Sequence, residues 1–308
     1  MLKHTDFRKL LILLLLATPA WAGIVEDVRA ALAQNSFSAA EASLNSYRAK
    51  NGVTPEYIEA YSWMGRTALS AHDYDHAAAY AKQTKDLALE QLKQHPLDSE
   101  PHLPLALGAA IEVQSQTLAA RGQRTQAVAV LQNALHAYGS TSIRARLQKN
   151  LNLLSLEGKP APALRAEQFL GSKPPILAQL KGSPVLLFFW AHWCSDCKAE
   201  IAIMAKLEQT YGPRGLVVVA PTQHYGYAAG GAEASPAAET QYARFVYAQY
   251  YASLGPVEVP LSAANFVNYG VSTTPTLALV DAHGIVRLYH PGNLDYDSLA
   301  ARIGPLLH

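Results

Sequence analysis

The stretch FFWAHWCSDCKAE, from Phe188 to Glu200, contains both cysteines of this 308-residue chain. Cys194 and Cys197 follow directly after a run of bulky apolar residues. A disulfide between such close neighbours constrains little of the chain, and exported proteins that depend on structural disulfides usually have several. A closed zinc site needs four ligands, and neither a second Cys-x-x-Cys motif nor a spaced histidine pair is evident. The pair therefore favours redox chemistry between sulfur atoms, with no bound cofactor or metal.

The residues on either side of the pair predict its local structure. PVLLFFWA, from Pro184, has the pattern of a buried strand, and SDCKAEIAIMAKLEQTYG that of a helix ending at Gly212. Cys194 would then lie at the N-terminus of the helix, where free N–H groups and the helix dipole stabilise a thiolate. We expect the sulfur of Cys194 to face solvent and act as the nucleophile. Cys197, one turn further in, would resolve the mixed disulfide.

Downstream of this helix, strand and helix patterns alternate. This order, with a hairpin near the C-terminus, predicts an α/β sandwich. The expected strands are residues 215–222, 257–262, 274–281 and 285–292, and the expected helices are residues 238–255 and 295–307.

The segment from Ile24 to about Leu156 shows apolar residues at helical spacing and no strand-like alternation. Three helix–turn–helix pieces, with turns at Asn35, His72 and Gly122, resemble tetratricopeptide repeats. Because the turns are irregularly spaced, an alanine-rich helical bundle without true repeats stays an alternative. LEGKPAPAL, from Leu156, breaks the helical pattern. We therefore predict a tetratricopeptide-like helical domain over residues 23–156 and a second domain over residues 157–308.

The first residues predict export. Basic residues precede an apolar run from Leu10 to Ala17, and small residues at Ala20 and Ala22 suit cleavage after Ala22. The run is too short to span a bilayer, which takes about 20 apolar residues. We expect residues 1–22 to be a signal peptide and the mature protein to be periplasmic. A formal net charge of +1 argues against nucleic acid as the main partner.

Residues 158–308 resemble the exported TlpA/ResA group of thioredoxin-fold thiol–disulfide oxidoreductases. The resemblance implies that Pro275 is cis and lies against the active-site disulfide, where the backbone beside Thr274 would bind a substrate strand. It also gives Trp193 a partial role in flanking the sulfur. The residues that carry the resemblance are Gly158 to Pro162, LKG at Leu180 to Gly182, Trp190, Trp193, Cys194, Cys197, Lys198, Glu200, and YGVSTTPTLALVDAHG from Tyr269.

Two positions depart from cytosolic thioredoxin. Asp196 lies between the cysteines, and a nearby carboxylate disfavours a thiolate. Phe188 occupies the position of the buried aspartate, for which Glu200 can substitute in the TlpA/ResA group. An ordinary first-turn glutamate that supports the helix dipole is the alternative for Glu200. A less stabilised thiolate gives a more reducing couple, so the chain is predicted to be a reductase.

The predicted function is therefore an exported enzyme that reduces disulfides of protein substrates. A membrane or periplasmic thiol would supply the electrons, and the helical domain would dock a protein partner or shape the site. The main alternative is a tetratricopeptide-like binding scaffold with an accessory thioredoxin domain. Copper handling stays open, whereas a peroxidase would need a Thr-x-x-Cys element ahead of Cys194. Tyr225 and Tyr227 would either contact substrates or belong to a flexible surface loop.

Overall fold

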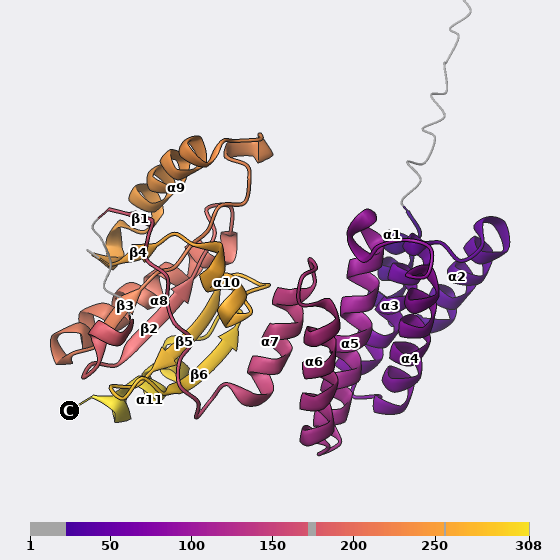
Figure 1. Ribbon diagram of the computed structural model, residues 1–308, viewed down its shortest axis with the longest axis horizontal. Coiled ribbons are helices and arrows are strands. Elements are labelled where there is room, and N and C mark those ends of the chain that lie inside the picture. Colours follow the sequence, from indigo (N-terminus) through magenta and orange to yellow (C-terminus); the bar gives the residue numbers. More distant parts are fainter. Residues whose placement is uncertain (1–22, 172–176, 256, 308) are drawn as a thin grey trace, which may run out of the picture.

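The computed structural model describes residues 23–171, 177–255 and 257–307 (Figure 1). The predicted signal peptide, residues 1–22, lies outside the described residues. Within the described ranges, no helix is both long enough and apolar enough to cross a membrane. The chain forms a helical region followed by a sheet region, which lie side by side and meet at α7 (Figure 1). This arrangement confirms the predicted fold class.

The helical region consists of paired antiparallel helices. Its elements are α1 (Ile24–Ala33), α2 (Phe37–Asn51), α3 (Pro55–Ser70), α4 (Tyr74–Gln91), the short 3-10 helix η1 (Leu97–Ser99), α5 (His102–Ala120), α6 (Arg124–Tyr138) and α7 (Arg144–Ser155). Ala40, Ala77 and Ala127 are fully buried, one in each second helix of a pair. Their small side chains let the helices approach closely, as their shared position in the sequence pattern suggested.

The three turns noted in the sequence have the same conformation. Asn35, His72 and Gly122 have φ values of 56°, 60° and 77°, in the left-handed region. At each turn the N–H of the following residue donates to a carbonyl five residues earlier, as in Ser36 to Ala31 and Asp73 to Ala68. The α1–α2, α3–α4 and α5–α6 pairs are therefore structurally similar units. Their identity as tetratricopeptide repeats stays a prediction.

The sheet region is built around four strands in the order β3-β2-β5-β6. These are β2 (Val185–Phe189), β3 (Val217–Val219), β5 (Thr276–Val280) and β6 (Val286–Pro291), and a separate pair joins β1 (Phe169–Leu170) to β4 (Val259–Pro260). The β2 strand runs parallel to β3 and antiparallel to β5. All residues of β2 and β5 are buried, because helices cover both faces of the sheet.

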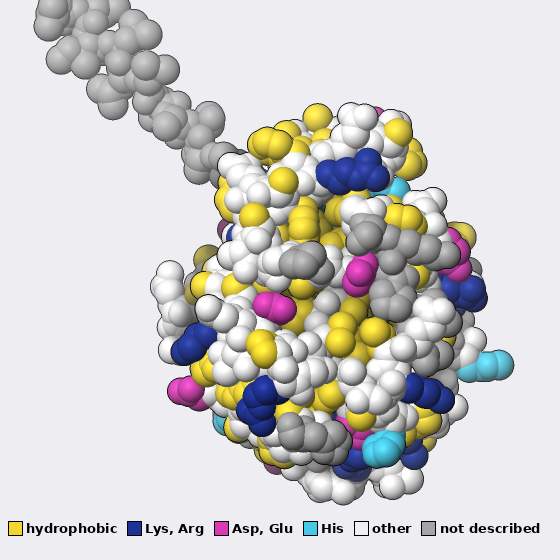
Figure 2. All heavy atoms as spheres, turned by 90° about the vertical axis from the view of Figure 1, so that its left-hand side faces the viewer, with side chains coloured by type: hydrophobic (Ala, Val, Ile, Leu, Met, Phe, Trp, Pro, Cys, Tyr) yellow, Lys and Arg dark blue, Asp and Glu magenta, His cyan; other side chains and the backbone are white. Residues whose placement is uncertain are grey.

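Helices pack on each face through alternate strand residues. Leu186 and Phe188 join the core that contains α8, α9 and α11, whereas Leu187 and Phe189 join the core that contains α10. The elements are α8 (Ser195–Tyr211), α9 (Pro236–Tyr250), α10 (Ala263–Tyr269) and α11 (Tyr296–Ile303), with 3-10 helices η2 (Leu177–Leu180), η3 (Gly212–Arg214), η4 (Ala229–Gly231), η5 (Ala252–Leu254) and η6 (Gly304–Leu306). On the outer face of the sheet region, basic, acidic and apolar side chains are interspersed (Figure 2).

Helix α7 connects the two regions and packs against both. The buried Asn152 side chain on α7 donates a hydrogen bond of 2.8 Å to the carbonyl of Tyr269 at the end of α10. The next residue, Gly270, has a φ of 63°, and a Cβ there would lie 2.3 Å from the backbone nitrogen of Lys149. Only glycine fits this contact, so it fixes α7 against the sheet region. The predicted division of the chain near residue 156 stays a prediction.

Candidate active site

Cys194 is the N-cap residue of α8 and forms a disulfide with Cys197. The Sγ of Cys194 accepts a hydrogen bond of 3.0 Å from the backbone N–H of Cys197. This places the sulfur at the positive end of the helix dipole, as the sequence predicts. The predicted exposure of Cys194 is wrong for this oxidised form, because Cys194 is only 2% exposed and Cys197 is fully buried. Both residues belong to the core formed by β2 and α8.

The peptide bond between Thr274 and Pro275 is cis, as the resemblance implies. Thr276, which follows, starts β5 and pairs with Phe189, the last residue of β2. Because the two strands are antiparallel, the loop before Thr276 and the segment that leads to Cys194 leave the same edge of the sheet. The hydroxyl of Thr274 is buried without a hydrogen-bond partner among the described residues. This edge therefore brings together the sulfur pair and an unsatisfied polar group.

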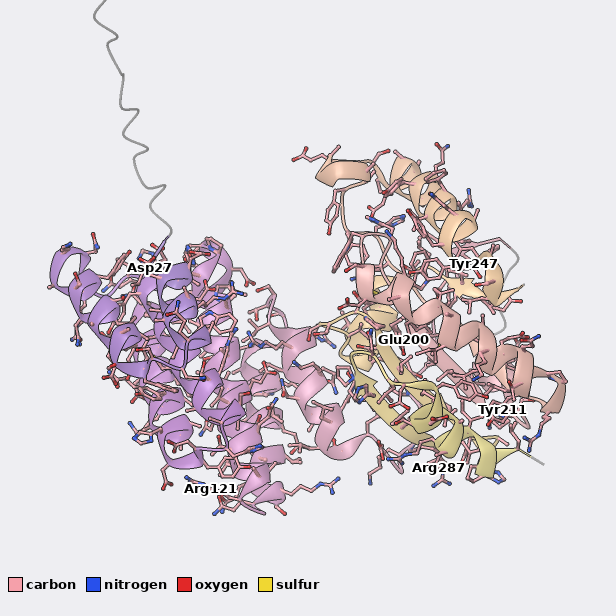
Figure 3. The ribbon with its side chains drawn as sticks, turned by 180° about the vertical axis from the view of Figure 1, so that it is seen from behind. Asp27, Arg121, Glu200, Tyr211, Tyr247 and Arg287 are labelled. Atoms are coloured by element: carbon pink, nitrogen blue, oxygen red, sulfur yellow. A yellow bond between two sulfur atoms is a disulfide. The ribbon has the colours of Figure 1, made fainter. Side chains whose placement is uncertain are left out.

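Glu200 is 2% exposed and points into the sheet region from α8 (Figure 3). Its Oε1 accepts a hydrogen bond of 3.0 Å from the backbone N–H of Leu294, which lies outside the helix. Burial raises the pKa of Glu200, and Asp295 adds to the effect, whereas the bond from Leu294 opposes it. Glu200 lies three residues after Cys197, so the two side chains share one face of α8. The raised pKa makes proton uptake by this carboxyl more favourable than by a solvated surface glutamate.

The two tryptophans of the motif lie in different environments. Trp190 is fully buried, donates from Nε1 to the carbonyl of Ala220 at 2.9 Å, and packs at 4.4 Å against the ring of Tyr251. Its contacts are those of a packing residue. Trp193, next to Cys194, is 49% exposed and makes an edge-to-face contact of 5.5 Å with Tyr225. Trp193 therefore offers an apolar surface beside the disulfide.

His192 was not singled out in the sequence, although it lies two residues before Cys194. It is 1% exposed, and its Nε2 lies 3.0 Å from Oε1 of Glu239, which is equally buried on α9. The rings of Tyr225, Tyr227 and Tyr242 surround it edge-to-face at 5.3 to 5.6 Å. These four residues belong to the segment from Gln223 to Gly255, which is inserted between β3 and β4. The inserted segment is thus joined to the active-site motif.

Glu239 also holds the start of the inserted segment. Its carboxylate accepts hydrogen bonds of 2.5 Å and 2.9 Å from the backbone N–H groups of Tyr225 and Gly226. Burial disfavours the charge on Glu239, but these bonds and the bond with His192 outweigh it and lower the pKa. Tyr225 is therefore packed into the fold, unlike a residue of a loose surface loop. In the described part of the chain, no group of three or more His, Cys, Asp or Glu side chains is placed to hold a metal ion.

Comparisons with known proteins agree with this geometry. Residues 158–224 match the model of the AhpC/TSA family. The chain is 29% identical over 138 residues to the thioredoxin-like protein YneN of Bacillus subtilis, covering 45% of this chain and 73% of that protein. It is 30% identical over 129 residues to the thiol-disulfide oxidoreductase ResA of Bacillus thuringiensis, covering 42% of this chain and 66% of that protein.

A solved structure of similar description is a thiol:disulfide interchange protein of the thioredoxin family from Chlorobium tepidum. It has 19% identity and a TM-score of 0.39, and the match covers 48% of this chain and 96% of that chain. The family match and the two relatives confirm the resemblance stated from the sequence. The chain is therefore a thioredoxin-fold protein similar to thiol–disulfide oxidoreductases, with a helical region ahead of the thioredoxin-fold domain.

Proposed function

We propose that this protein is an exported reductase of protein disulfides. In the reduced form, the Cys194 thiolate attacks one sulfur of a substrate disulfide, a mixed disulfide forms, and the other substrate sulfur leaves as a thiolate that takes up a proton. Cys197 loses its proton and attacks Sγ of Cys194, which releases the second substrate thiol. The substrate gains two electrons and two protons, and the enzyme becomes the Cys194–Cys197 disulfide. A thiol donor in the membrane or the periplasm then reduces this disulfide.

The single observation that carries the proposal is the position of Cys194 at the N-terminus of α8. The Cys197 N–H that lies 3.0 Å from Sγ in the disulfide would donate to the thiolate of the reduced form. A hydrogen bond from a helix N-terminus favours the charged sulfur, which is the attacking species. Cys197 is fully buried and lies within the first turn of α8, so it suits the resolving role.

The residues around the pair have supporting roles in the proposal. The cis-Pro275 loop, with Thr274, would offer backbone groups to an extended substrate strand. Trp193 would cover the apolar flank of the scissile disulfide. Glu200, buried on the Cys197 face of α8, would accept the proton of Cys197 before its attack. Its negative charge, like that of Asp196, would disfavour the thiolate form and make the couple more reducing.

A measurement of the reduction potential tests the proposed direction. The mature protein is equilibrated with defined dithiothreitol buffers, and the reduced fraction is counted by alkylation. We expect a potential closer to the about −270 mV of thioredoxin than to the about −120 mV of the strongest periplasmic oxidant. A value near the upper figure would make the protein an oxidase. Failure of the reduced protein to reduce insulin would favour the scaffold alternative.

A further inference from the structure

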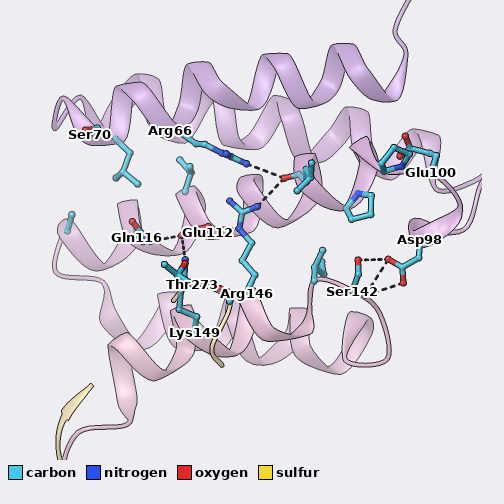
Figure 4. A pocket seen from close by; sticks show the side chains of 18 of the residues that line it. Arg66, Ser70, Asp98, Glu100, Glu112, Gln116, Ser142, Arg146, Lys149 and Thr273 are labelled. Carbon is cyan, nitrogen blue, oxygen red and sulfur yellow. Dashed lines mark hydrogen bonds and ion pairs between the residues drawn. The ribbon is translucent and has the colours of Figure 1, made fainter. Parts of the chain in front are cut away.

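A large groove lies where the helical region meets the sheet region (Figure 4). Its volume is about 1320 Å³, and its walls come from α3, α5 and α7 together with Ser272 and Thr273. Pockets for small molecules usually measure about 300 to 1,000 Å³. The groove is larger and open, and apolar side chains such as Leu105, which is 45% exposed, alternate with charged ones. These dimensions suit an extended polypeptide segment.

Cations line the floor of the groove. Glu112 on α5 pairs with two of them on α7, Arg146 at 2.5 Å and Lys149 at 2.8 Å. Only 14 to 20% of each of these side chains is exposed. Figure 4 shows the three converging from facing helices. One carboxylate therefore forms ion pairs with two cations in a partly dehydrated site.

Arg66 on α3 adds a third cation, for which the structure shows no ion pair among the described residues. Its guanidinium stacks on Trp63 at 4.3 Å and donates to the carbonyl of Leu105 at 3.4 Å. Arg146 donates to the same carbonyl at 3.3 Å, so the two guanidinium groups converge on one acceptor. The Nε of Arg66 is buried without a partner. Burial and the nearby charge of Arg146 lower the pKa of Arg66 to about 10.

At the Arg66 end of the groove cations outnumber acidic side chains, whereas Asp98 and Glu100 line the other end (Figure 4). Glu112 is the acidic neighbour that Arg66, Arg146 and Lys149 share, and Glu59 also attracts Arg66. One buried N–H of Arg66 has no acceptor among the described residues. Unpaired buried donors and adjacent like charges both cost free energy. A carboxylate beside the terminal nitrogens of Arg66 and Arg146 would accept charge-assisted hydrogen bonds and offset the repulsion between the two guanidinium groups. This end of the groove is therefore electrostatically complementary to an acidic side chain.

The groove also adjoins the candidate active site. The tight contact between Gly270 and Lys149 holds the start of the cis-proline loop against α7. Ser272 and Thr273, both exposed, then form part of the groove wall. Thr274 and cis-Pro275 follow at the sheet edge from which the segment with Cys194 departs. A chain in the groove can therefore continue toward Cys194 along this loop.

We propose that this groove binds an extended segment of the disulfide-containing protein substrate, with an acidic side chain of that segment between Arg66 and Arg146. This deepens the proposed function and rests on it for the identity of the occupant. The helical region then selects substrates, and the loop from Ser272 to Pro275 passes the bound chain to the sulfur pair. Binding does not require the sulfur chemistry, so the two can be tested separately.

Binding is measured by fluorescence anisotropy with the oxidised mature protein. The probes are two labelled ten-residue peptides without cysteine, which differ only in having two glutamates or two glutamines. We expect the glutamate peptide to bind about tenfold more tightly, the scale of one charge-assisted hydrogen bond. Arg66→Gln should remove this preference. Arg48→Gln, which removes the same charge from the exposed surface of α2 outside the groove, should keep it.

A second variant at Arg66 distinguishes loss of the positive charge from loss of folding. Arg66→Lys keeps the charge and should retain a glutamate preference that Arg66→Gln lacks, with both variants checked by thermal melting. Equal affinity of the wild type for the two peptides would overturn the proposal. So would a preference that survives in a folded Arg66→Gln protein.

A kinetic experiment tests whether binding in the groove increases the rate of disulfide reduction at Cys194. The reduced protein reacts with disulfide-linked versions of the same peptides and with hydroxyethyl disulfide, which is small and uncharged. We expect the glutamate version to react about tenfold faster, and Arg66→Gln to abolish that advantage without changing the rate for hydroxyethyl disulfide. Equal rates for the two peptides would contradict delivery from the groove. No reaction with any disulfide, while the anisotropy preference persists, would reject the reductase and leave the groove standing.

Discussion

The two regions of this molecule assemble their working residues in different ways. In the sheet region, Cys194 and Cys197 are close in sequence, and one strand pairing brings the Thr274–Pro275 loop to the same edge. In the helical region, Arg66, Glu112 and Arg146 come from three helices, and only the stacking of those helices forms the groove. A site of the first kind can be found as a motif. A site of the second kind becomes visible only in three dimensions.

Helix α7 contacts both the groove and the sheet region that holds the sulfur pair. Lys149 and Arg146 face the groove from this helix, while Asn152 and the backbone of Lys149 contact the residues at the end of α10. The helix is therefore both a wall of the groove and a support for the cis-proline loop. Changes at the sulfur pair, at this contact and in the groove should consequently have distinct effects, which decrease in size in that order.

The largest effect is expected at the sulfur pair. Cys197→Ser leaves the mixed disulfide on Cys194 without a resolving thiol, so a periplasm that expresses this variant should accumulate covalent complexes with partner proteins. Cys194→Ser should accumulate almost none, and both variants should lose insulin reduction. Non-reducing gels followed by mass spectrometry measure the trapped complexes. Trapping by Cys194→Ser instead would reverse the assignment of the nucleophile.

The next largest effect is expected at the contact between the regions. Gly270→Ala would introduce a Cβ 2.3 Å from the Lys149 backbone at a φ of 63°. We expect a loss of more than about 2 kcal/mol in the free energy of unfolding, since strain at φ alone costs about 1 to 2 kcal/mol. Urea unfolding measures it. Gly122→Ala is the control, because that glycine has a φ of 77° with no atom within 4 Å of a Cβ. Equal losses in both would show that the regions are not tightly held at α7.

Much of the fold could be predicted from the sequence because its signals are local. The strands β2 and β5 are apolar runs, and both of them and β6 lie within the expected ranges. The strands β1 and β4 are two residues long and depend on pairing with each other, so β1 was not expected and β4 was expected to be longer. Ser235 and Pro236 start α9 earlier than expected, and Ser-Pro at a helix start is a signal that the sequence contains.

The candidate site divides along the same lines. The cysteine pair, the cis-proline loop and the position of Glu200 follow from a motif and a family resemblance. The pairing of His192 with Glu239 joins residues 47 positions apart, across a segment whose path no local pattern determines. The acceptor that Arg66 lacks is likewise a property of the packed helices. Long-range polar pairing is the information that the sequence alone did not reveal.

A smaller effect, dependent on pH, is expected at one buried carboxylate in each region. Burial disfavours the charge on Glu112, but Arg146 and Lys149 outweigh it and lower the pKa from 4.5 to about 2. The ionised form therefore stabilises the fold above the unfolded pKa, and this stabilisation should be lost as the pH falls from about 5 toward 2.

The test compares two variants by urea unfolding across this pH range. Glu112→Gln should make the free energy of unfolding lower at neutral pH and less dependent on acid. Glu239→Gln should behave similarly in the sheet region, because hydrogen bonds lower the pKa of Glu239 as well. If the acid dependence of Glu112→Gln matches that of the wild type, the charged cluster does not stabilise the groove.

The smallest effect is expected at Glu200. Removing its charge should not lower the melting temperature, as a loss of packing would, and should change the reactivity of the thiols only slightly. Burial raises the pKa of Glu200, so its ionised form is less favourable in the folded state than in the unfolded one. This cost is absent below the unfolded pKa and grows as the pH rises through the folded pKa. Glu200→Gln keeps the acceptor for the Leu294 N–H and removes the charge. The variant should therefore melt at or slightly above the wild-type temperature at neutral pH.

Loss of the negative charge should also lower the apparent pKa of Cys194 and change the exchange rate by less than about tenfold. Thiolate absorbance during a pH titration measures the first quantity, and stopped-flow reaction with hydroxyethyl disulfide the second. Glu208→Gln, a matched change two turns further along α8, should leave the thiol titration as it is. If Glu200→Gln also leaves that titration unchanged, Glu200 contributes to the fold through its bond to Leu294 and has no part in the sulfur chemistry.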